Sequence, residues 1–175
     1  MKFSKEECAF FTGHRDVWIV RSEKGIKWLI NCARAKGIKH FYCGMALGVD
    51  QQVARILIDW NLSWTAVIPC GDQDKLWTNK QKKAYQQLLK LAPFKKVLYP
   101  KYEPGVMQAR NRWMIERSCA CLAVWRQWKE SGGTYHTVQA AKKEGLAIAV
   151  FDPDKQEGYG IDPTYPQQLE LELSN

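Results

Sequence analysis

The amino-acid sequence predicts a single α/β domain, built on an open, mostly parallel β-sheet with helices on both of its faces. Short apolar segments alternate with longer amphipathic segments, which is the pattern of strands joined by helical crossovers. The apolar segments are almost continuously hydrophobic, as strands buried on both faces of a parallel sheet are. The 175 residues suffice for one domain with a sizeable core, and no internal repeat or domain boundary interrupts residues 1–153.

Six apolar segments are predicted as strands, because apolar, aromatic and β-branched residues dominate them. The first reads CAFFT and the last LAIAVF. The fourth, FKKVLY, is the most polar, and Pro100 ends it because proline cannot donate to a strand ladder. In order, the predicted strands span residues 8–12, 39–43, 64–69, 94–99, 119–125 and 146–151.

Five segments between these strands carry apolar residues at helical spacing. In the first, Ile26, Leu29 and Ile30 share one face, and Gly37 supplies a stop. The third is long and polar, and Gly145 ends the fifth. In order, the predicted helices span residues 22–36, 50–60, 74–91, 109–117 and 134–143.

The alternating pattern stops after Pro153, and residues 154–175 are predicted to form an acidic C-terminal tail. Its acidic residues are Asp154, Glu157, Asp162, Glu170 and Glu172. Two arrangements fit this composition. The tail is either partly disordered or lies back on the basic N-terminal half.

The formal net charge of +8 is unevenly distributed. Residues 1–100 carry 17 Lys and Arg against 8 Asp and Glu, whereas residues 101–175 carry 9 against 10. A basic half favours an anionic partner, either a phosphate-bearing small molecule or a nucleic acid. Lysines on a solvated face of the predicted helix 74–91 are the alternative explanation for much of this charge.

No apolar run approaches the roughly 20 residues that span a bilayer, and the first residues, MKFSKEECAF, do not read as a signal peptide. We therefore expect a cytoplasmic protein with no membrane partner and with reduced, mostly buried cysteines. A zinc site is the alternative for the six cysteines. No C-x-x-C pair is present and Cys119-x-Cys121 has no matching second pair, so we expect neither a metal nor another cofactor.

Ligands of open parallel sheets bind beyond the carboxyl ends of the strands, so the residues after each strand are candidates for a site. Gly13, His14 and Arg15 follow the first strand. Gly13 permits a tight turn, Arg15 can bind a phosphate or carboxylate bidentately, and His14 can donate to a phosphate or shuttle a proton. The alternative is structural, with Arg15 paired to a nearby acid and His14 capping a helix.

The turn GMALGVD follows the second predicted strand and opens a helix. Gly44 and Gly48 bring the chain to a helix N-terminus, whose unpaired N–H groups and partial positive charge suit an anion. Asp50 has two possible roles, because its carboxylate can bind ligand hydroxyls or simply cap the helix.

The turn after the fifth predicted strand also opens a helix. Its residues offer hydroxyl groups and accessible backbone N–H groups, which form a second anion-binding turn on the same edge: Ser131, Gly132, Gly133 and Thr134.

The predicted helix 109–117 begins close to the same edge with Arg110, Asn111 and Arg112. Cationic side chains at a helix N-terminus oppose the helix dipole, so we expect an anion nearby. A ligand phosphate or Glu116 could supply it.

These segments together resemble the SLOG superfamily of Rossmann-like proteins, in particular its YpsA-like branch. The motifs are GHR at 13–15, GMALGVD at 44–50 and SGGT at 131–134, and the resemblance covers roughly residues 8–151. GMALGVD is similar to a GxxxGxD turn that this branch shares with the DNA-processing protein DprA. RNRWMIERS resembles the Arg-rich helix start shared by DprA and the Lonely-guy phosphoribohydrolases.

The resemblance implies a Rossmann-like fold and a nucleotide or nucleotide-derived ligand. It assigns Gly44, Gly48 and Asp50 to one ligand-binding turn and Gly132, Gly133 and Thr134 to another, and it places Arg112 near the basic position of the family. The Lonely-guy enzymes carry PGGxGT followed closely by a catalytic Glu. Here SGGTYHTVQAA has no acid before Glu144, so Glu116 or Asp50 would have to act in glycosidic cleavage.

Three functions follow from these features. The first is binding of a nucleotide-like small molecule, as a sensor, a sequestering protein or a weak hydrolase. The second is a phosphoribohydrolase or nucleosidase acting on a nucleoside monophosphate, and the third is single-stranded DNA binding in the manner of DprA. Eight tryptophans are too many for deep burial in one domain and favour a homo-oligomer.

Overall fold

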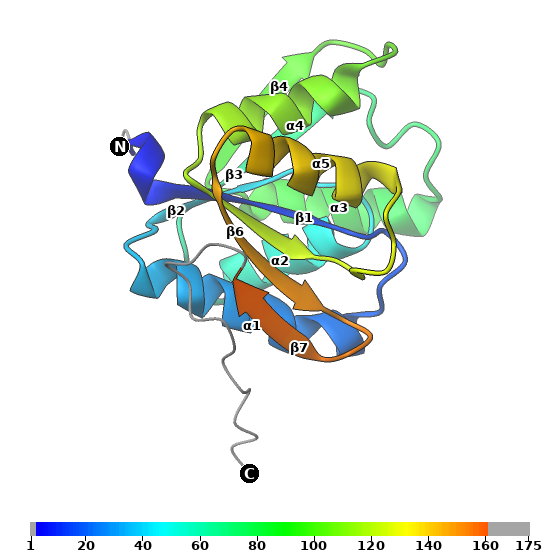
Figure 1. Ribbon diagram of the computed structural model, residues 1–175. Helices are drawn as coiled ribbons and strands as arrows, with labels where there is room; N and C mark the ends of the chain where they lie inside the picture. Colours follow the sequence, from blue (N-terminus) through cyan, green and yellow to red (C-terminus); the bar gives the residue numbers. More distant parts are fainter. Residues whose placement is uncertain (1–2, 161–175) are drawn as a thin grey trace.

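The computed structural model describes residues 3–160, which form one sheet of seven strands (Figure 1). The strands are β1 (Cys8–Gly13), β2 (His40–Cys43), β3 (Trp64–Cys70), β4 (Phe94–Tyr99), β5 (Ala120–Val124), β6 (Ala147–Asp152) and β7 (Glu157–Gly160). Their order is β4-β3-β2-β1-β5-β6-β7, and all neighbours are parallel except the antiparallel pair β6 and β7. The predicted open, mostly parallel, Rossmann-like architecture is confirmed.

Helices cover both faces of this sheet. They are α1 (Ile19–Ala35), α2 (Val49–Asp59), α3 (Asn79–Leu91), α4 (Val106–Glu116) and α5 (Gly132–Lys143), preceded by a short 3-10 helix at Lys5–Glu7. The first three helices pack on one face, and α4 and α5 pack on the other (Figure 1). Each face therefore has its own apolar layer. Phe11 lies in the layer toward α1 and α2, and Phe10, its neighbour on β1, lies in the layer toward α4 and α5.

Three helix starts differ from the sequence prediction by three or more residues. Helix α3 begins at Asn79 rather than at residue 74, because Thr78 caps it. The hydroxyl of Thr78 accepts from the Gln81 backbone N–H at 3.3 Å, and the Gln81 side chain accepts from the Thr78 N–H at 2.9 Å. Helices α1 and α4 begin three residues earlier than predicted, at Ile19 and Val106.

Strand β7 lies in the segment predicted as an acidic tail. Its sequence, EGYG, has no apolar run, so its strand character comes from pairing with β6 rather than from propensity. Gly158 packs against the Trp28 ring, and an added Cβ there would meet this ring at 2.5 Å. The rest of the predicted tail, residues 161–175, lies outside the described residues.

The order of the strands creates one switch point. From β1 the chain adds β2, β3 and β4 on one side, and it then returns to place β5 on the other side of β1. The crossovers that follow β1 and β5 therefore diverge, and this divergence opens a crevice at the carboxyl edge of the sheet.

Residues 3–160 contain no helix that is long and apolar enough to cross a membrane. The six cysteines lie within this range and are unpaired; Cys32 and Cys119 are half-buried and the other four are buried. Of the eight tryptophans, Trp18 and Trp128 are the exposed ones, so the homo-oligomer prediction depends on these two.

Candidate functional site

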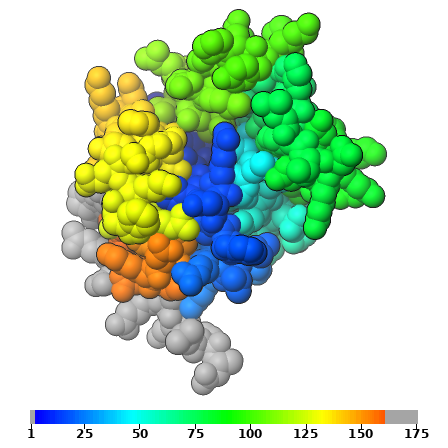
Figure 2. Space-filling model, turned by 90° about the vertical axis from the view of Figure 1, so that its right-hand side faces the viewer, coloured from blue at the N-terminus to red at the C-terminus, as the bar shows by residue number. Residues whose placement is uncertain are grey.

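A cavity of about 400 Å³ opens at the switch point between β1 and β5. Figure 2 looks onto this edge, with the blue β1–α1 segment at the centre between the yellow residues that lead into α5 and the green residues of α3 and α4. Ten of the thirteen predicted ligand-binding residues line the cavity: Gly13, His14, Arg15, Asp50, Arg110, Asn111, Ser131, Gly132, Gly133 and Thr134.

The turn after β1 packs closely against the start of α2. The Val49 N–H donates to the His14 carbonyl oxygen at 3.2 Å. A Cβ at Gly13 would meet Val49 at 2.5 Å, and a Cβ at Gly48 would meet the Arg15 backbone at 2.5 Å. Gly48 also has φ +85 and ψ −127, a conformation that side chains other than glycine rarely adopt. These glycines thus allow two segments of the chain to cross.

His14 is buried at the side of the cavity and is held in one orientation. Its Nε2 accepts a hydrogen bond from the Arg126 backbone N–H at 3.1 Å, which assigns the ring proton of the neutral imidazole to Nδ1. Burial lowers the pKa of His14, and the positive charges of Arg126 and Lys129 lower it further. His14 is therefore a neutral imidazole with its proton on Nδ1 in the lining of the cavity.

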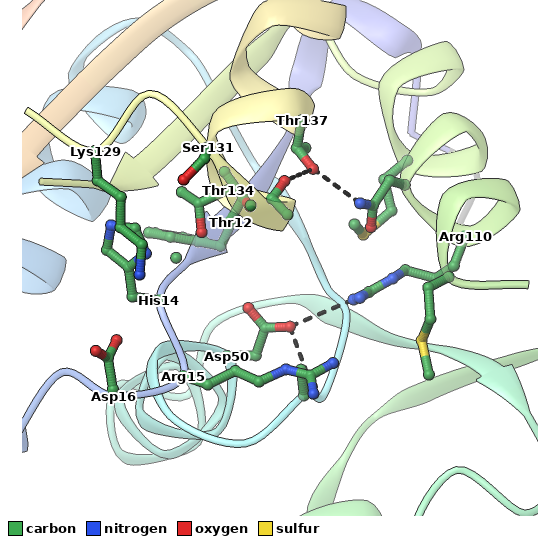
Figure 3. Close-up of a pocket in the computed structure, with 18 residues that line it drawn as sticks. Thr12, His14, Arg15, Asp16, Asp50, Arg110, Lys129, Ser131, Thr134 and Thr137 are labelled. Atoms are coloured by element: carbon green, nitrogen blue, oxygen red, sulfur yellow. Dashed lines mark hydrogen bonds and ion pairs between the residues drawn. The ribbon is translucent and has the colours of Figure 1, made fainter. Parts of the chain in front are cut away.

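Asp50 and Arg110 form a buried ion pair in the wall of the cavity (Figure 3). Nη1 of Arg110 lies 3.3 Å from Oδ2 of Asp50, and the same oxygen accepts from the Ala46 N–H at 3.1 Å. Burial raises the pKa of the Asp50 carboxyl, while the nearby Arg110 and Arg15 charges act in the opposite direction. Nε of Arg110 is buried and has no hydrogen-bond partner within residues 3–160.

The glycines of the site fall into two groups. Gly44 makes room for the ion pair, because a Cβ there would overlap the guanidinium of Arg110. Gly44 and Gly48 do not line the cavity and instead support its wall. At Gly132 and Gly133, by contrast, an added Cβ would meet nothing within 4 Å. The open backbone of the site is therefore the start of α5.

The start of α5 is tied to α4 through two side chains. The Thr137 hydroxyl donates to the Gly133 carbonyl oxygen at 2.7 Å and accepts from the Asn111 side-chain amide at 2.8 Å (Figure 3). Thr134 is buried and Ser131 is exposed at the mouth. These contacts fix the N-terminus of α5 so that its unpaired N–H groups lie at the cavity.

Two further predicted residues lie outside the cavity, besides Gly44 and Gly48. Arg112 and Glu116 pair with each other at 3.7 Å on the exposed side of α4, so Glu116 supplies a negative charge to Arg112 rather than to the site. Sequence reasoning also missed residues that line the cavity. Lys129 lies in the connection before α5, and Met107 lies in the first turn of α4.

Comparison with known proteins assigns this chain to a protein family. Residues 8–155 match the profile of the YspA SLOG family, which is most of the chain. The protein belongs to the YspA SLOG family. The predicted SLOG resemblance is thereby confirmed.

Curated relatives of this SLOG protein include two bacterial proteins. It is 31% identical over 142 residues to the SPbeta prophage-derived protein YoqJ of Bacillus subtilis, covering 71% of this chain and 82% of the relative. It is 22% identical over 176 residues to a UPF0398 protein of Halalkalibacterium halodurans, covering 96% of this chain and 87% of the relative.

Solved structures with a similar fold include two DNA-processing proteins A. The Streptococcus pneumoniae DprA aligns with a TM-score of 0.61 at 17% identity, over 86% of this chain and 50% of that chain. The Helicobacter pylori DprA, described by its single-stranded DNA binding mode, aligns with a TM-score of 0.63 at 20% identity. The alignment covers 85% of this chain and 66% of that chain. The SLOG protein thus spans half to two thirds of these chains, and it shares their fold.

Proposed function

We propose that this SLOG protein binds a nucleotide or nucleotide-derived ligand, with a phosphate of the ligand at the N-terminus of α5. The observation that carries the proposal is the open backbone of Gly132 and Gly133 at the cavity. A helix N-terminus combines unpaired N–H groups with a partial positive charge, and both suit a phosphate. Lys129 adds a positive charge beside this turn, and Ser131 and Thr134 add hydroxyl donors.

The opposite side of the cavity suits the sugar of such a ligand. The Asp50 oxygen that is not bonded to Arg110 points toward the side of Ser131 and Thr134 (Figure 3). An ionised carboxylate only accepts hydrogen bonds, so it selects a ligand group that donates, such as a ribose hydroxyl.

An apolar part of the lining suits a flat base. Phe11, Met107 and Met114 contribute carbon and sulfur surface to the cavity. The cavity volume of about 400 Å³ lies within the roughly 300–1,000 Å³ of small-molecule sites. Charged, polar and apolar groups thus occur together in one site of suitable size.

Binding without cleavage is supported better than hydrolysis. Glu116 lies outside the cavity, and Asp50 is engaged by Arg110 and the Ala46 N–H. If the protein is a phosphoribohydrolase or nucleosidase, incubation with a panel of nucleoside monophosphates will release free base, and Asp50→Asn will abolish that release. No base release beside demonstrated binding would exclude this activity.

Calorimetry with the same nucleoside monophosphates tests the proposed binding site. Gly133→Asp should abolish binding, because it places a negative charge and a side chain at the phosphate position. Gly133→Ala is the matched control, because it adds a Cβ at the same position without the charge, and a Cβ there meets nothing within 4 Å. Unchanged affinity of the Gly133→Asp protein would show the site assignment to be wrong.

Single-stranded DNA binding is a second candidate, favoured by a basic surface on α3 and β4. From residue 75 to residue 101 the chain has eight lysines and no acidic residue, and none of these lysines forms an ion pair within residues 3–160. DNA binding there should weaken steeply with salt. The affinity for single-stranded DNA should also fall in Lys80→Gln/Lys83→Gln and persist in Gly133→Asp. A nucleotide bound in the cavity should show the reverse, with its affinity lost in Gly133→Asp and kept in Lys80→Gln/Lys83→Gln.

A further inference from the structure

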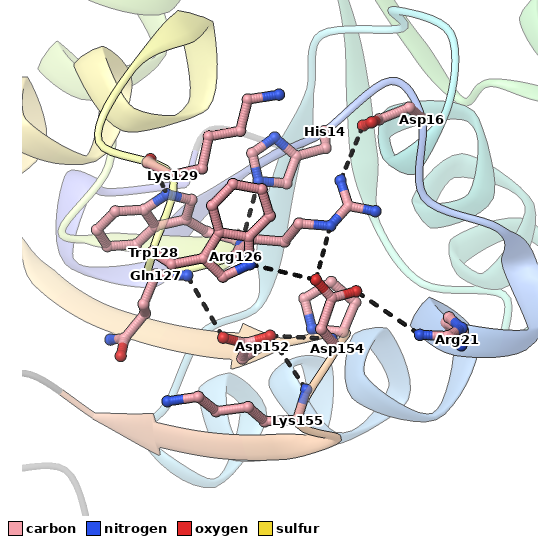
Figure 4. A network of polar contacts seen from close by, with 12 residues as sticks. His14, Asp16, Arg21, Arg126, Gln127, Trp128, Lys129, Asp152, Asp154 and Lys155 are labelled. Carbon is pink, nitrogen blue, oxygen red and sulfur yellow. Dashed lines mark hydrogen bonds and ion pairs between the residues drawn. The ribbon is translucent and has the colours of Figure 1, made fainter.

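Arg126 joins three segments of the chain beside the cavity (Figure 4). Its Nη1 lies 3.1 Å from Asp16 in the β1–α1 connection, and its Nε lies 3.0 Å from Asp154 in the β6–β7 turn. Only 15% of the Arg126 side chain is exposed, although Asp16 is largely exposed. The guanidinium therefore bridges two loops that are 138 residues apart in sequence, from a third loop that leads into α5.

The backbone of the same residue contacts the site. The Arg126 N–H donates to Nε2 of His14 at 3.1 Å, and His14 lines the cavity. Because a neutral imidazole carries one ring proton, an N–H donor at Nε2 leaves that proton on Nδ1.

Several contacts anchor the loop that carries the Arg126 N–H. The Trp125 N–H donates to the Phe151 carbonyl oxygen at 3.0 Å, and the Trp128 indole donates to Asp154 at 3.3 Å. The neighbouring Gln127 N–H donates to Asp152 at 3.4 Å, which is a long hydrogen bond, and the Trp125 indole donates to the Lys129 carbonyl oxygen within the same loop at 3.1 Å. The Asp16 ion pair ties this loop to the β1–α1 connection, to which His14 also belongs, and the Asp154 ion pair ties the loop to the β6–β7 turn.

We propose that Arg126 is a positioning residue that holds His14 with its proton on Nδ1, so that the imidazole presents a neutral hydrogen-bond donor to the phosphate of the ligand. This inference rests on the proposed function for its ligand, but the state of His14 is a property of the protein alone. The donor suits an anion without adding a charge that would change with pH near neutrality.

Four charged groups lie near His14 and influence its pKa. Arg126 and Lys129 favour the neutral ring, whereas Asp16 and Asp154 favour the protonated ring; burial adds to the first pair and lowers the pKa of His14 overall. Removal of the Arg126 side chain eliminates one positive charge and both ion pairs of the loop, and we expect the loop to move its backbone N–H away from Nε2 of His14. Loss of the charge and loss of the N–H donor both favour the protonated ring.

Nitrogen-detected NMR of the full chain without ligand tests the proposal directly. We expect Nδ1–H in the native protein and a pKa of His14 below 6.5. Arg126→Gln should mix the two tautomers and raise this pKa, because it removes a positive charge that lowers it. Arg21→Ala is the control, since Arg21 pairs with the same Asp154 at 3.7 Å but does not contact Asp16 or His14, and it should leave both readouts unchanged.

If Arg126→Gln does not fold, Asp16→Asn removes one anchor at an exposed position and should produce the same mixed tautomers. An Nε2–H tautomer in the native protein, or an unchanged His14 in every folded variant, would overturn the proposal. Titration with inorganic phosphate at pH 7.5 is the second measurement, and about tenfold weaker binding is expected for Arg126→Gln. Equal phosphate affinity in both proteins would also overturn the proposed role of Arg126. If the native protein gives the expected NMR result but does not bind phosphate, the proposed function is refuted instead.

Discussion

Arg110 and Asp50 pair at 3.3 Å inside the cavity, and each side chain is more than nine-tenths buried. Burial of two charges is unfavourable by itself, so the pair is stable only while each partner compensates the other. Gly44 belongs to the same arrangement, because only a residue without Cβ leaves room for the guanidinium.

Arg110→Met should lower the free energy of unfolding by about 3–5 kcal/mol, because it leaves the Asp50 carboxylate buried without its partner. Urea denaturation measures the loss. Arg112→Ala is the control two residues away, and its exposed pair with Glu116 should contribute less than about 0.5 kcal/mol. Arg110→Met/Asp50→Asn should recover part of the stability, and a double mutant less stable than Arg110→Met would contradict this account.

Gly48→Ala should destabilise the fold by at least about 2 kcal/mol, because of its positive φ and the approach of the Arg15 backbone. Gly37→Ala separates these two causes. Gly37 has φ +90 with open space around it, so alanine there should lose only about 1 kcal/mol. Thermal unfolding of both variants gives the comparison, and equal losses would mean that the chain crossing at Gly48 relaxes freely.

His40 should make stability depend on pH between about 6.5 and 4. Burial between Ser63 and Thr65 lowers its pKa to about 4 in the folded protein, against 6.5 for the free side chain. Between these values the unfolded chain binds a proton that the folded protein does not, so stability falls as the pH falls. The loss reaches up to about 3 kcal/mol at pH 4.

Urea denaturation from pH 7.5 to pH 4 measures this dependence. In His40→Gln the corresponding part of the pH dependence should disappear. A variant with the same pH profile as the native protein would show that other groups cause the acid sensitivity.

Thr137→Val should weaken ligand binding by more than it lowers stability. Valine has a similar shape but neither accepts from Asn111 nor donates to the Gly133 carbonyl oxygen, so the start of α5 loses its link to α4. The stability loss should be about 1 kcal/mol, as for one hydrogen bond. Thr137→Ser keeps the hydroxyl and should retain affinity in calorimetry; a loss as large as that of valine would contradict the role of the hydroxyl.

The sequence predicts most of the fold because the central strands β1, β3, β5 and β6 are buried on both faces. Such strands read as continuous apolar runs, and CACLAVW and LAIAVF predict β5 and β6 within one or two residues. Strand β7 escaped prediction because EGYG becomes a strand only through its pairing with β6 and its contact with Trp28. Pairing between segments leaves no local pattern in the chain.

The site was predicted in its parts but not in its internal contacts. The three turns after strands identify where ligand-facing residues lie, since all parallel strands end at one edge. The sequence does not show that Gly44 and Gly48 serve packing while Gly132 and Gly133 remain open, because glycine looks the same in both roles. Nor does it pair Arg110 with Asp50, which lies 60 residues away.

The walls of the cavity come from four separate connections, those that follow β1, β2, β4 and β5. No single fragment of the chain therefore supplies enough of the lining to form the cavity. The cavity forms only when the central strands are all paired in register. A molecule that occupies it must stabilise the whole sheet at once, by an amount that grows with its concentration. The melting temperature of the intact protein is thus a direct way to search for the natural ligand.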